Sequence, residues 1–144
     1  MEINLPILKL RLLLIVTIIC FSSCGSTKKV SFNNSAVVPG AEGTVKVKKD
    51  KNGNYHMEVE VQHLADSKKL TPSKNAYVVW IETKEKGIKN IGQVHSSSSM
   101  FSKTKKAAIE TVSPTKPVRI FITAEDDPIV EDPGSLVVLT TDSF

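Results

Sequence analysis

Cysteine, arginine and aromatic side chains are scarce in this sequence. Of its 144 residues two are cysteines, Cys20 and Cys24, and both precede the main body of the chain. Residues 25–144 therefore cannot hold a disulfide framework, a thiol nucleophile, a cysteine zinc site or an iron–sulfur cluster. Arg119 is the one arginine of that body, and aromatic residues make up 6% of the chain. Because nucleic-acid readers favour arginine forks and interleaved aromatic side chains, we expect no nucleic-acid partner.

The motifs of the common enzyme sites are also missing. The sequence contains no P-loop, no dinucleotide-binding glycine pattern and no HExxH. The four serines at 96–99 are not set in a Gly-x-Ser-x-Gly elbow. We therefore expect a protein that is not an enzyme and needs no cofactor. Hydrophobic residues make up 40% of the chain, which is enough for the packed core of one domain.

The N-terminal residues have the pattern of a secretory signal. Lys9 and Arg11 precede a ten-residue run at 12–21 that is apolar except for Thr17, and small residues follow. A membrane-spanning helix needs about 20 apolar residues, which is more than this run provides. Residues 1–23 are therefore interpreted as a signal peptide rather than as an anchor helix.

Residues 21–25 (FSSCG) resemble the lipobox of bacterial lipoproteins, in which an aliphatic residue and two small residues precede the lipidated cysteine. The two serines and Cys24 match, whereas Phe21 stands where leucine is commonest. Cys20 matches less well because two bulky isoleucines precede it. The resemblance implies that Cys24 is the first mature residue and that its acyl chains hold the protein on a membrane. The alternative is an ordinary secretory signal cut nearby, which leaves a soluble exported protein.

The residues after Cys24 bear on the location and on the start of the domain. In lipoproteins of the Bacteroidetes an acidic cluster after the cysteine is associated with surface display, and this chain has none. The resemblance thus implies an outer-membrane lipoprotein that faces the periplasm. Residues 24–41 are rich in Ser, Asn, Lys and Gly, which predicts a flexible tether. The folded domain is expected over 42–144.

Alternation of polar and apolar residues predicts strands over this domain. Residues 43–48 and 55–62 alternate with a period of two, and the Asn-Gly pair within Asp50–Asn54 predicts a hairpin with a type I′ turn. The apolar run Ala76–Thr83 predicts a central strand buried on both faces, with Trp80 between two sheets. Gly92 is expected at a bulge or close approach. Further strands are expected at 88–95, 107–112, 117–125 and 135–141, which predicts a β-sandwich or small barrel of about seven strands.

This pattern resembles the C-terminal domain of anti-sigma-K factors over about residues 42–141. The matching residues are Tyr77–Ile81 (YVVWI), Gly92, Ile122–Glu125 (ITAE), and Pro133-Gly134 followed by Val137–Leu139. The resemblance implies an all-β fold, an immunoglobulin-like antiparallel β-sandwich, outside the cytoplasm. It does not imply anti-sigma activity, because the family's sigma-binding part lies before a spanning helix and this sequence shows neither. The chain is also similar to short lipoproteins of the Bacteroidetes built from this domain alone.

The loop before the last predicted strand is the strongest candidate for contact with an ion or a partner. Oxygen-rich loops bind calcium, paired carboxylates can catalyse hydrolysis, and Pro128 and Pro133 lower the entropy lost on binding. The alternatives are a solvated connection, or a plug in which Ile129 and Val130 fold back on the domain. The candidate binding residues are Glu125, Asp126, Asp127, Ile129, Glu131 and Asp132.

Two further patterns suggest metals less strongly. Imidazole and thioether ligands suit copper, although Met57 shares the apolar face of its strand and is expected in the core. The spacing of Asp50, Asn52 and Asn54 matches the start of a calcium loop, but Val61 stands where the last glutamate would be. We therefore expect no metal site, and interpret these residues as surface and turn residues. The copper candidates are His56, His63, His95, Met57 and Met100.

Together these features predict a monomeric, non-catalytic, membrane-anchored lipoprotein of the cell envelope. It would present its β-sandwich as a binding or structural module, with the membrane and an envelope protein as partners. The alternative is an ion- or metal-binding envelope module that uses residues 125–132 or the histidines. The net charge of +4, with lysines clustered at 46–51 and 103–106, would place a basic face near anionic lipid headgroups.

Overall fold

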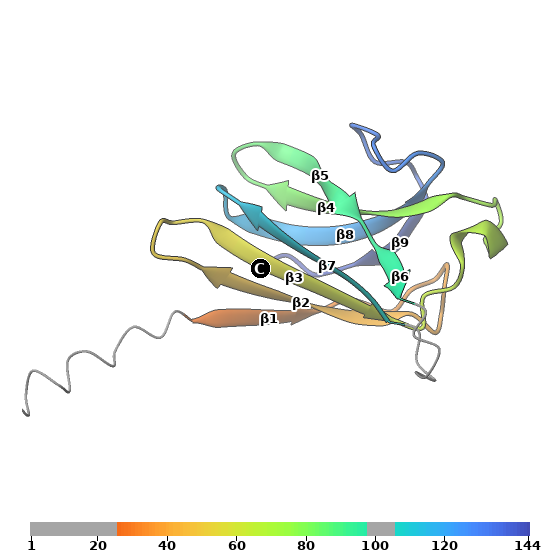
Figure 1. Cartoon of the computed structure of the whole chain (residues 1–144), viewed down its shortest axis with the longest axis horizontal. Helices are drawn as coiled ribbons and strands as arrows, with labels where there is room; N and C mark the ends of the chain where they lie inside the picture. Colours follow the sequence, from red (N-terminus) through yellow and green to blue (C-terminus); the bar gives the residue numbers. More distant parts are fainter. Residues whose placement is uncertain (1–25, 98–105) are drawn as a thin grey trace, which may run out of the picture.

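The computed structural model describes residues 26–97 and 106–144, and it shows two antiparallel sheets packed as a β-sandwich (Figure 1). One sheet has the strand order β1-β2-β3-β7-β6 and the other β5-β4-β8-β9. The all-β prediction is confirmed. The strands are β1 (Thr27–Ser31), β2 (Glu42–Lys49), β3 (Tyr55–Gln62), β4 (Ala76–Thr83), β5 (Gly87–Gln93), β6 (His95–Ser97), β7 (Lys106–Ser113), β8 (Pro117–Glu125) and β9 (Val137–Thr140), with a short 3-10 helix η1 (Ser67–Lys69) after β3.

The main core lies between the two sheets and follows from the alternation of the sequence. Every second residue of a strand points to the same face, so the apolar set of each strand meets the set of the opposite sheet. Met57 packs in this core, as expected. The described part of the chain contains no helix long and apolar enough to cross a membrane. The main core includes Val45, Val47, Val59, Val61, Val79, Ile81, Ile120, Ile122 and Leu139.

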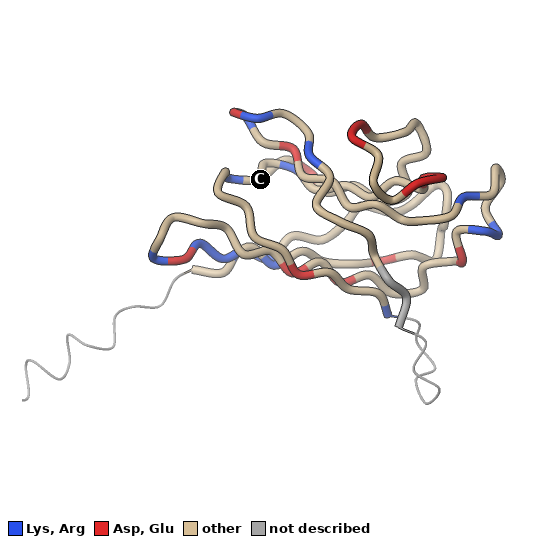
Figure 2. The backbone as a smooth tube through the Cα atoms, turned by 45° about the horizontal axis from the view of Figure 1, so that its top comes forward, with Lys and Arg blue, Asp and Glu red and all other residues tan. Residues whose placement is uncertain are grey.

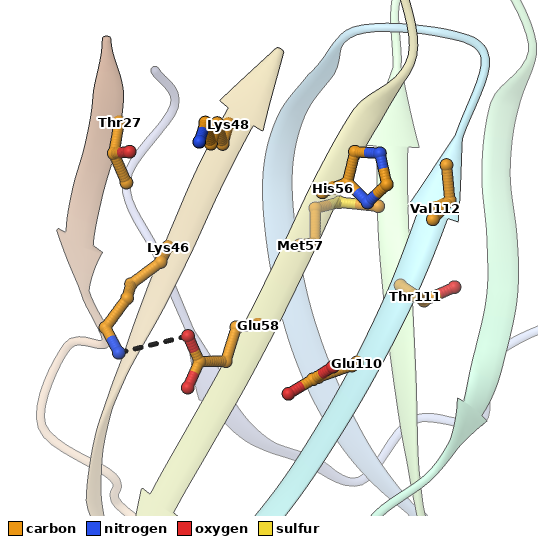
Figure 3. Close-up of a pocket in the computed structure, with 9 residues that line it drawn as sticks. All are labelled: Thr27, Lys46, Lys48, His56, Met57, Glu58, Glu110, Thr111 and Val112. Atoms are coloured by element: carbon orange, nitrogen blue, oxygen red, sulfur yellow. Dashed lines mark hydrogen bonds and ion pairs between the residues drawn. The ribbon is translucent and has the colours of Figure 1, made fainter. Parts of the chain in front are cut away.

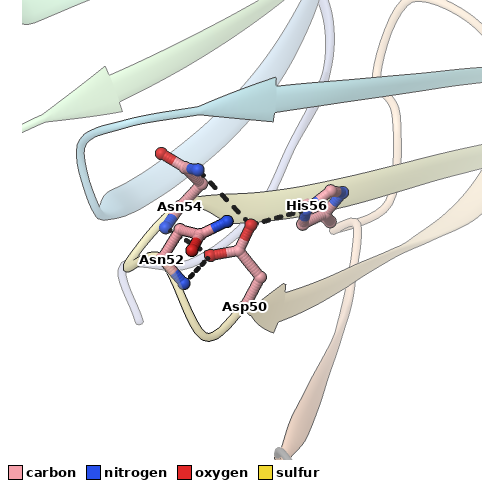
Figure 4. Close-up of polar contacts among 4 residues, drawn as sticks. All are labelled: Asp50, Asn52, Asn54 and His56. Carbon is pink, nitrogen blue, oxygen red and sulfur yellow. Dashed lines mark hydrogen bonds and ion pairs between the residues drawn. The ribbon is translucent and has the colours of Figure 1, made fainter.

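The predicted hairpin is confirmed, but its turn differs from the expected type. β2 and β3 pair down to Lys49 opposite Tyr55, and Gly53 alone in the turn has a positive φ, of 88°. A type I′ turn needs two such residues. Here Asp50 shapes the turn instead, because its Oδ1 accepts hydrogen bonds from the backbone N–H groups of Asn52 at 2.8 Å and Asn54 at 2.9 Å (Figure 4). The spacing that suggested a calcium loop is therefore that of an aspartate-capped turn.

The segment predicted as a flexible tether is part of the sandwich from residue 27 onward. β1 pairs with β2 along its whole length, from Thr27 opposite Lys48 to Ser31 opposite Thr44. Behind it Phe32, Val38 and Ala41 are buried in the main core. The tether prediction is wrong for these residues because an edge strand with a solvated face can be as polar as a loop. With β1 and the short β6, the described chain has nine strands rather than about seven.

Gly92 lies at a bulge, as predicted. The pairing of β4 with β5 shifts register between Val79 and Trp80, opposite Gly92, whose φ is 127°. A Cβ atom at this position would lie 2.6 Å from Cδ1 of Ile109 in β7. The glycine therefore lets β5 bend toward the other sheet, where a side chain would be excluded.

Tyr77 places a polar atom inside the sandwich. Its hydroxyl group is buried, and in residues 26–97 and 106–144 it has no hydrogen-bond partner. Burial, with a smaller contribution from the negative charge of Asp66, raises the pKa of Tyr77 to about 12. The folded protein thus carries a desolvated hydroxyl that resists ionisation.

Replacement of Tyr77 by phenylalanine is expected to leave the free energy of unfolding at neutral pH unchanged or to raise it by up to about 1 kcal/mol, because a buried hydroxyl without a partner only costs desolvation. Free tyrosine has a pKa of 10.0, so above that pH the unfolded chain releases a proton that folded Tyr77 keeps. Stability must then fall as the pH rises from 10 toward 12. Urea unfolding across this pH range should show that the free energy of unfolding falls less steeply for Tyr77→Phe than for the parent protein. Parallel pH dependences in the two proteins would contradict the raised pKa of Tyr77.

Candidate binding surface

Trp80 lies on the outer face of the four-stranded sheet and not between the sheets. Side chains of β4 alternate, so Val79 and Ile81 enter the main core while Val78 and Trp80 point the opposite way. Trp80 is 0% exposed and stacks on Phe121 of β8, with 6.3 Å between ring centroids. The prediction that Trp80 is buried is confirmed, and its expected place between the sheets is wrong. A second small core therefore exists on this face.

The loop between β8 and β9, residues 126–136, covers this second core. Val130 packs on the cluster of Val78, Trp80 and Phe121. In Figure 1 it is the blue loop that leads into β9. Of the two apolar residues considered for a plug, Val130 folds back, whereas Ile129 is 81% exposed. The loop thus covers Trp80 and at the same time presents the side chain of Ile129 to solvent.

A chain of hydrogen bonds, two buried and the last partly buried, fixes the far end of the loop to the sheet. Nε1 of Trp80 donates to Oγ1 of Thr123 at 2.7 Å, and that hydroxyl donates to Oε1 of Glu125 at 2.5 Å. The same carboxyl oxygen accepts the backbone N–H of Gly134 at 2.7 Å. A Cβ atom at position 134 would lie 2.7 Å from Oε2 of Glu125, so a side chain there would push the carboxylate out of this arrangement. Glu125 is 6% exposed and is therefore a structural residue rather than a surface ligand.

Two other contacts hold the near half of the loop. Nδ2 of Asn90 in β5 donates to the carbonyl oxygens of Pro128 at 3.0 Å and Val130 at 2.9 Å. Nζ of Lys74 lies 2.7 Å from Oδ2 of Asp126. Sequence reasoning did not identify Asn90 and Lys74, because each bonds to a residue far along the chain. The residues on both sides of Ile129 are therefore fixed while its own side chain faces solvent.

An open groove of about 630 Å³ runs between β5 and this loop. Ile129 and Ile88, which is 42% exposed, supply its large exposed apolar side chains, with Lys89 and Glu131 as charged neighbours. Apolar residues with a charged rim are typical of a protein-binding surface. The lining residues are Ile88, Lys89, Asn90, Gly92, Gln93, Pro128, Ile129, Val130 and Glu131.

The predicted acidic residues do not converge on one point. Glu125 is buried against Thr123, Asp126 pairs with Lys74, and Oδ1 of Asp127 accepts the backbone N–H of Ile129 at 2.9 Å. Glu131 lines the groove, and Asp132 is exposed. Within residues 26–97 and 106–144, no three His, Cys, Asp or Glu side chains are grouped to hold a metal ion. Of the six candidates, Ile129 and Glu131 belong to the groove.

The candidate copper ligands are likewise not brought together in the described part of the chain. Nε2 of His56 lies 3.0 Å from Oδ2 of Asp50 (Figure 4), and Nδ1 of His63 lies 3.4 Å from Oε1 of Glu42. Burial alone would raise the pKa of Asp50, but hydrogen bonds from His56, Asn54 and Asn52 together hold it below its usual value. Met100 and the side chain of His95 lie outside the described residues.

The outer face of the five-stranded sheet forms a second hollow, of about 580 Å³, between β2, β3 and β7 (Figure 3). Lys46 donates to Glu58 at 3.0 Å, and Glu110 stands opposite Glu58 in the adjacent strand. The hydrogen bond between Lys46 and Glu58 is the main cause that raises the pKa of Lys46 and lowers the pKa of Glu58. This face carries Lys46, Glu58 and Glu110 side by side, and Val112 is its one large exposed apolar side chain among the lining residues, whereas Ile88 and Ile129 both line the groove.

Comparisons of the chain with protein families, with curated proteins and with solved structures found no match.

Proposed function

We propose that the protein is a non-catalytic binding module of the cell envelope, anchored to a membrane through lipid on Cys24, that recognises an envelope protein through the groove between β5 and the 126–136 loop. The signal-like residues 1–23 and the lipobox support the anchor. The proposal includes the resemblance to the anti-sigma-K C-terminal domain: the module would be an immunoglobulin-like domain without anti-sigma activity.

The exposure of Ile129 on a fixed loop is the observation that carries the binding role. An isoleucine that is 81% exposed contributes little buried apolar surface to folding. The loop that holds it is pinned through Asn90, Lys74 and Glu125, so little conformational entropy would be lost when a partner covers the side chain. Such an arrangement suits a partner with an apolar side chain flanked by polar groups.

The binding role predicts where a partner can be cross-linked. A photoreactive amino acid at position 129 or 88 is expected to give the same adduct in intact envelopes, because these positions line one groove. Position 112 is the matched control, since Val112 is an exposed apolar residue, at 52%, on the outer face of the other sheet. Ile129→Ser should then weaken capture of that partner by roughly tenfold, as for a moderate interface residue, with an unchanged melting temperature. Equal adducts from 112 and 129 would contradict the proposal.

The proposed anchor predicts that the protein leaves the membrane fraction when the thiol of Cys24 is removed. The N-terminal peptide of the mature protein should begin at Cys24 and carry the mass of its acyl chains. Cys24→Ala should abolish that modification and move the protein out of the membrane fraction, because two or three acyl chains are what hold such a protein on lipid. An unmodified Cys24 in the mature protein, or membrane association that survives Cys24→Ala, would refute the lipid anchor. Cys20→Ala is the matched control and should leave fractionation unchanged.

A further inference from the structure

One end of the sandwich gathers two hairpin turns and one turn between the sheets around the start of β1. Thr27 pairs with Lys48 near the end of β2, Tyr55 with Ser113 at the end of β7, and Thr83 with Pro117 at the start of β8. The β2–β3, β4–β5 and β7–β8 turns therefore all project from the end at which β1 begins (Figure 1). We call this the β1 end.

The β1 end is rich in exposed lysines. None of them lies within 4.0 Å of a carboxylate in the described part of the chain, and Asp50 and Glu85 are the carboxylates of its turns. Two are held by aromatic rings, since Nζ of Lys28 lies 5.3 Å from the centroid of Phe144 and Nζ of Lys49 lies 5.6 Å from that of Tyr55. The lysines are Lys28, Lys48, Lys49, Lys51, Lys84, Lys86 and Lys116.

The opposite end has the opposite character among the described residues. It carries the loop with Asp126, Asp127, Glu131 and Asp132, together with Asp66 and Glu42, against the lysines Lys68, Lys69, Lys74 and Lys106. Lys74 is already paired with Asp126. Figure 2 shows blue positions on the turns of the β1 end and red positions on the loop between β8 and β9. Among the described residues, positive charge therefore gathers at the β1 end, and carboxylates are in slight excess at the other end.

The short distance along the chain from Cys24 to β1 constrains how an anchored domain can lie. Thr27 is three residues after Cys24, and three residues span at most about 11 Å even when fully extended. This is close to the distance of about 8 Å over which charges interact at physiological salt. A lipid on Cys24 would keep the β1 end within reach of the headgroups, and the charge of that end then decides whether it lies on them.

We propose that the β1 end lies on the anionic phospholipid surface of the membrane, with its lysines against lipid phosphates, and that the end with Asp126 and Asp66 faces away from the bilayer. This inference rests on the proposed lipid anchor at Cys24, and adds to it an orientation and a lipid preference. Lysines near such a surface each strengthen binding about fivefold. The same orientation turns the carboxylates of the opposite end away from a surface of like charge.

The test measures which lysines the membrane protects. The full protein, purified from its own membranes in mature form, is reconstituted into vesicles with about 30% phosphatidylglycerol or into vesicles of phosphatidylcholine alone, compositions chosen to vary the surface charge. Amine-reactive labelling read by mass spectrometry should be severalfold slower at Lys49, Lys51 and Lys84 than at Lys68 and Lys69 in the anionic vesicles. High salt should lessen that difference, because screening weakens the attraction of lysine for phosphate.

Paired variants separate charge from fold. Lys51→Gln with Lys84→Gln removes two turn lysines of the β1 end and should restore labelling of Lys49 and Lys86 in anionic vesicles. Lys68→Gln with Lys69→Gln removes the same charge from η1 and should change nothing. Both pairs are exposed, so neither should move the melting temperature.

The outcomes are distinct. Acylated Cys24 with equal labelling at both ends overturns the orientation and leaves the anchor intact. Protection at the β1 end that is the same in phosphatidylcholine and in high salt overturns the lipid preference. A mature protein whose intact mass shows no acyl chain on Cys24 refutes the anchor, and the orientation falls with it.

Discussion

Replacement of Trp80 by alanine is expected to lower the free energy of unfolding by about 3–5 kcal/mol, the usual cost of removing a fully buried aromatic side chain. Trp80 is 0% exposed, stacks on Phe121 and donates its N–H to Thr123. Its loss leaves a cavity under Val130 and removes the floor on which the 126–136 loop rests. Urea unfolding followed by circular dichroism measures the loss of stability. The native fluorescence of the parent protein reports whether Trp80 is buried.

Trp80→Phe is the control that separates volume from hydrogen bonding. Phenylalanine fills much of the space but does not donate to Thr123, so we expect a loss of about 1–2 kcal/mol, between the parent and the alanine variant. The parent protein should emit in the blue, as expected of an indole away from water. A red emission maximum, or an alanine variant within about 1 kcal/mol of the parent, would contradict the buried position.

The strand pattern shows how far local sequence determines this fold. The apolar run at 76–83 predicts a strand buried on both faces, and β4 is such a strand. Periodicity does not say what covers each face of this strand. The face with Trp80 is covered by a loop that begins 46 residues later, at Asp126. The tether was predicted in error for a related reason: β1 is polar in itself and is fixed by its pairing with β2.

In the candidate binding surface, too, the sequence indicates the loop but not its contacts with residues that are distant along the chain. From the sequence, Ile129 and Val130 are treated together, as a contact surface or as a plug, and the structure separates them, because Ile129 is exposed and Val130 packs on the second core. The role of Glu125 could not be predicted, since its charge suggested a surface residue and its burial depends on Thr123 and Gly134. The contacts of Asn90 and Lys74 span 38 to 52 residues, and no periodic pattern encodes them.

Glu125→Ala is expected to cost roughly 2–4 kcal/mol, because it removes the buried acceptor shared by Thr123 and Gly134, and an unpaired buried donor costs about 1–3 kcal/mol. The hydroxyl of Thr123 loses its acceptor, and the backbone N–H of Gly134 loses its bond to the sheet. Unfolding in urea measures the loss. Hydrogen exchange should also show faster exchange at Gly134 than in the parent.

Asp126→Ala is the matched control on the adjacent residue of the same loop. The side chain of Asp126 is 71% exposed and its contact with Lys74 is a surface ion pair, so its loss should cost less than about 1 kcal/mol. If both variants cost the same, the buried bonds of Glu125 do not hold the loop. If Glu125→Ala alone destabilises, it should also weaken cross-linking through position 129 while the Asp126 variant does not, because the groove depends on a loop whose far end Glu125 fastens to the sheet.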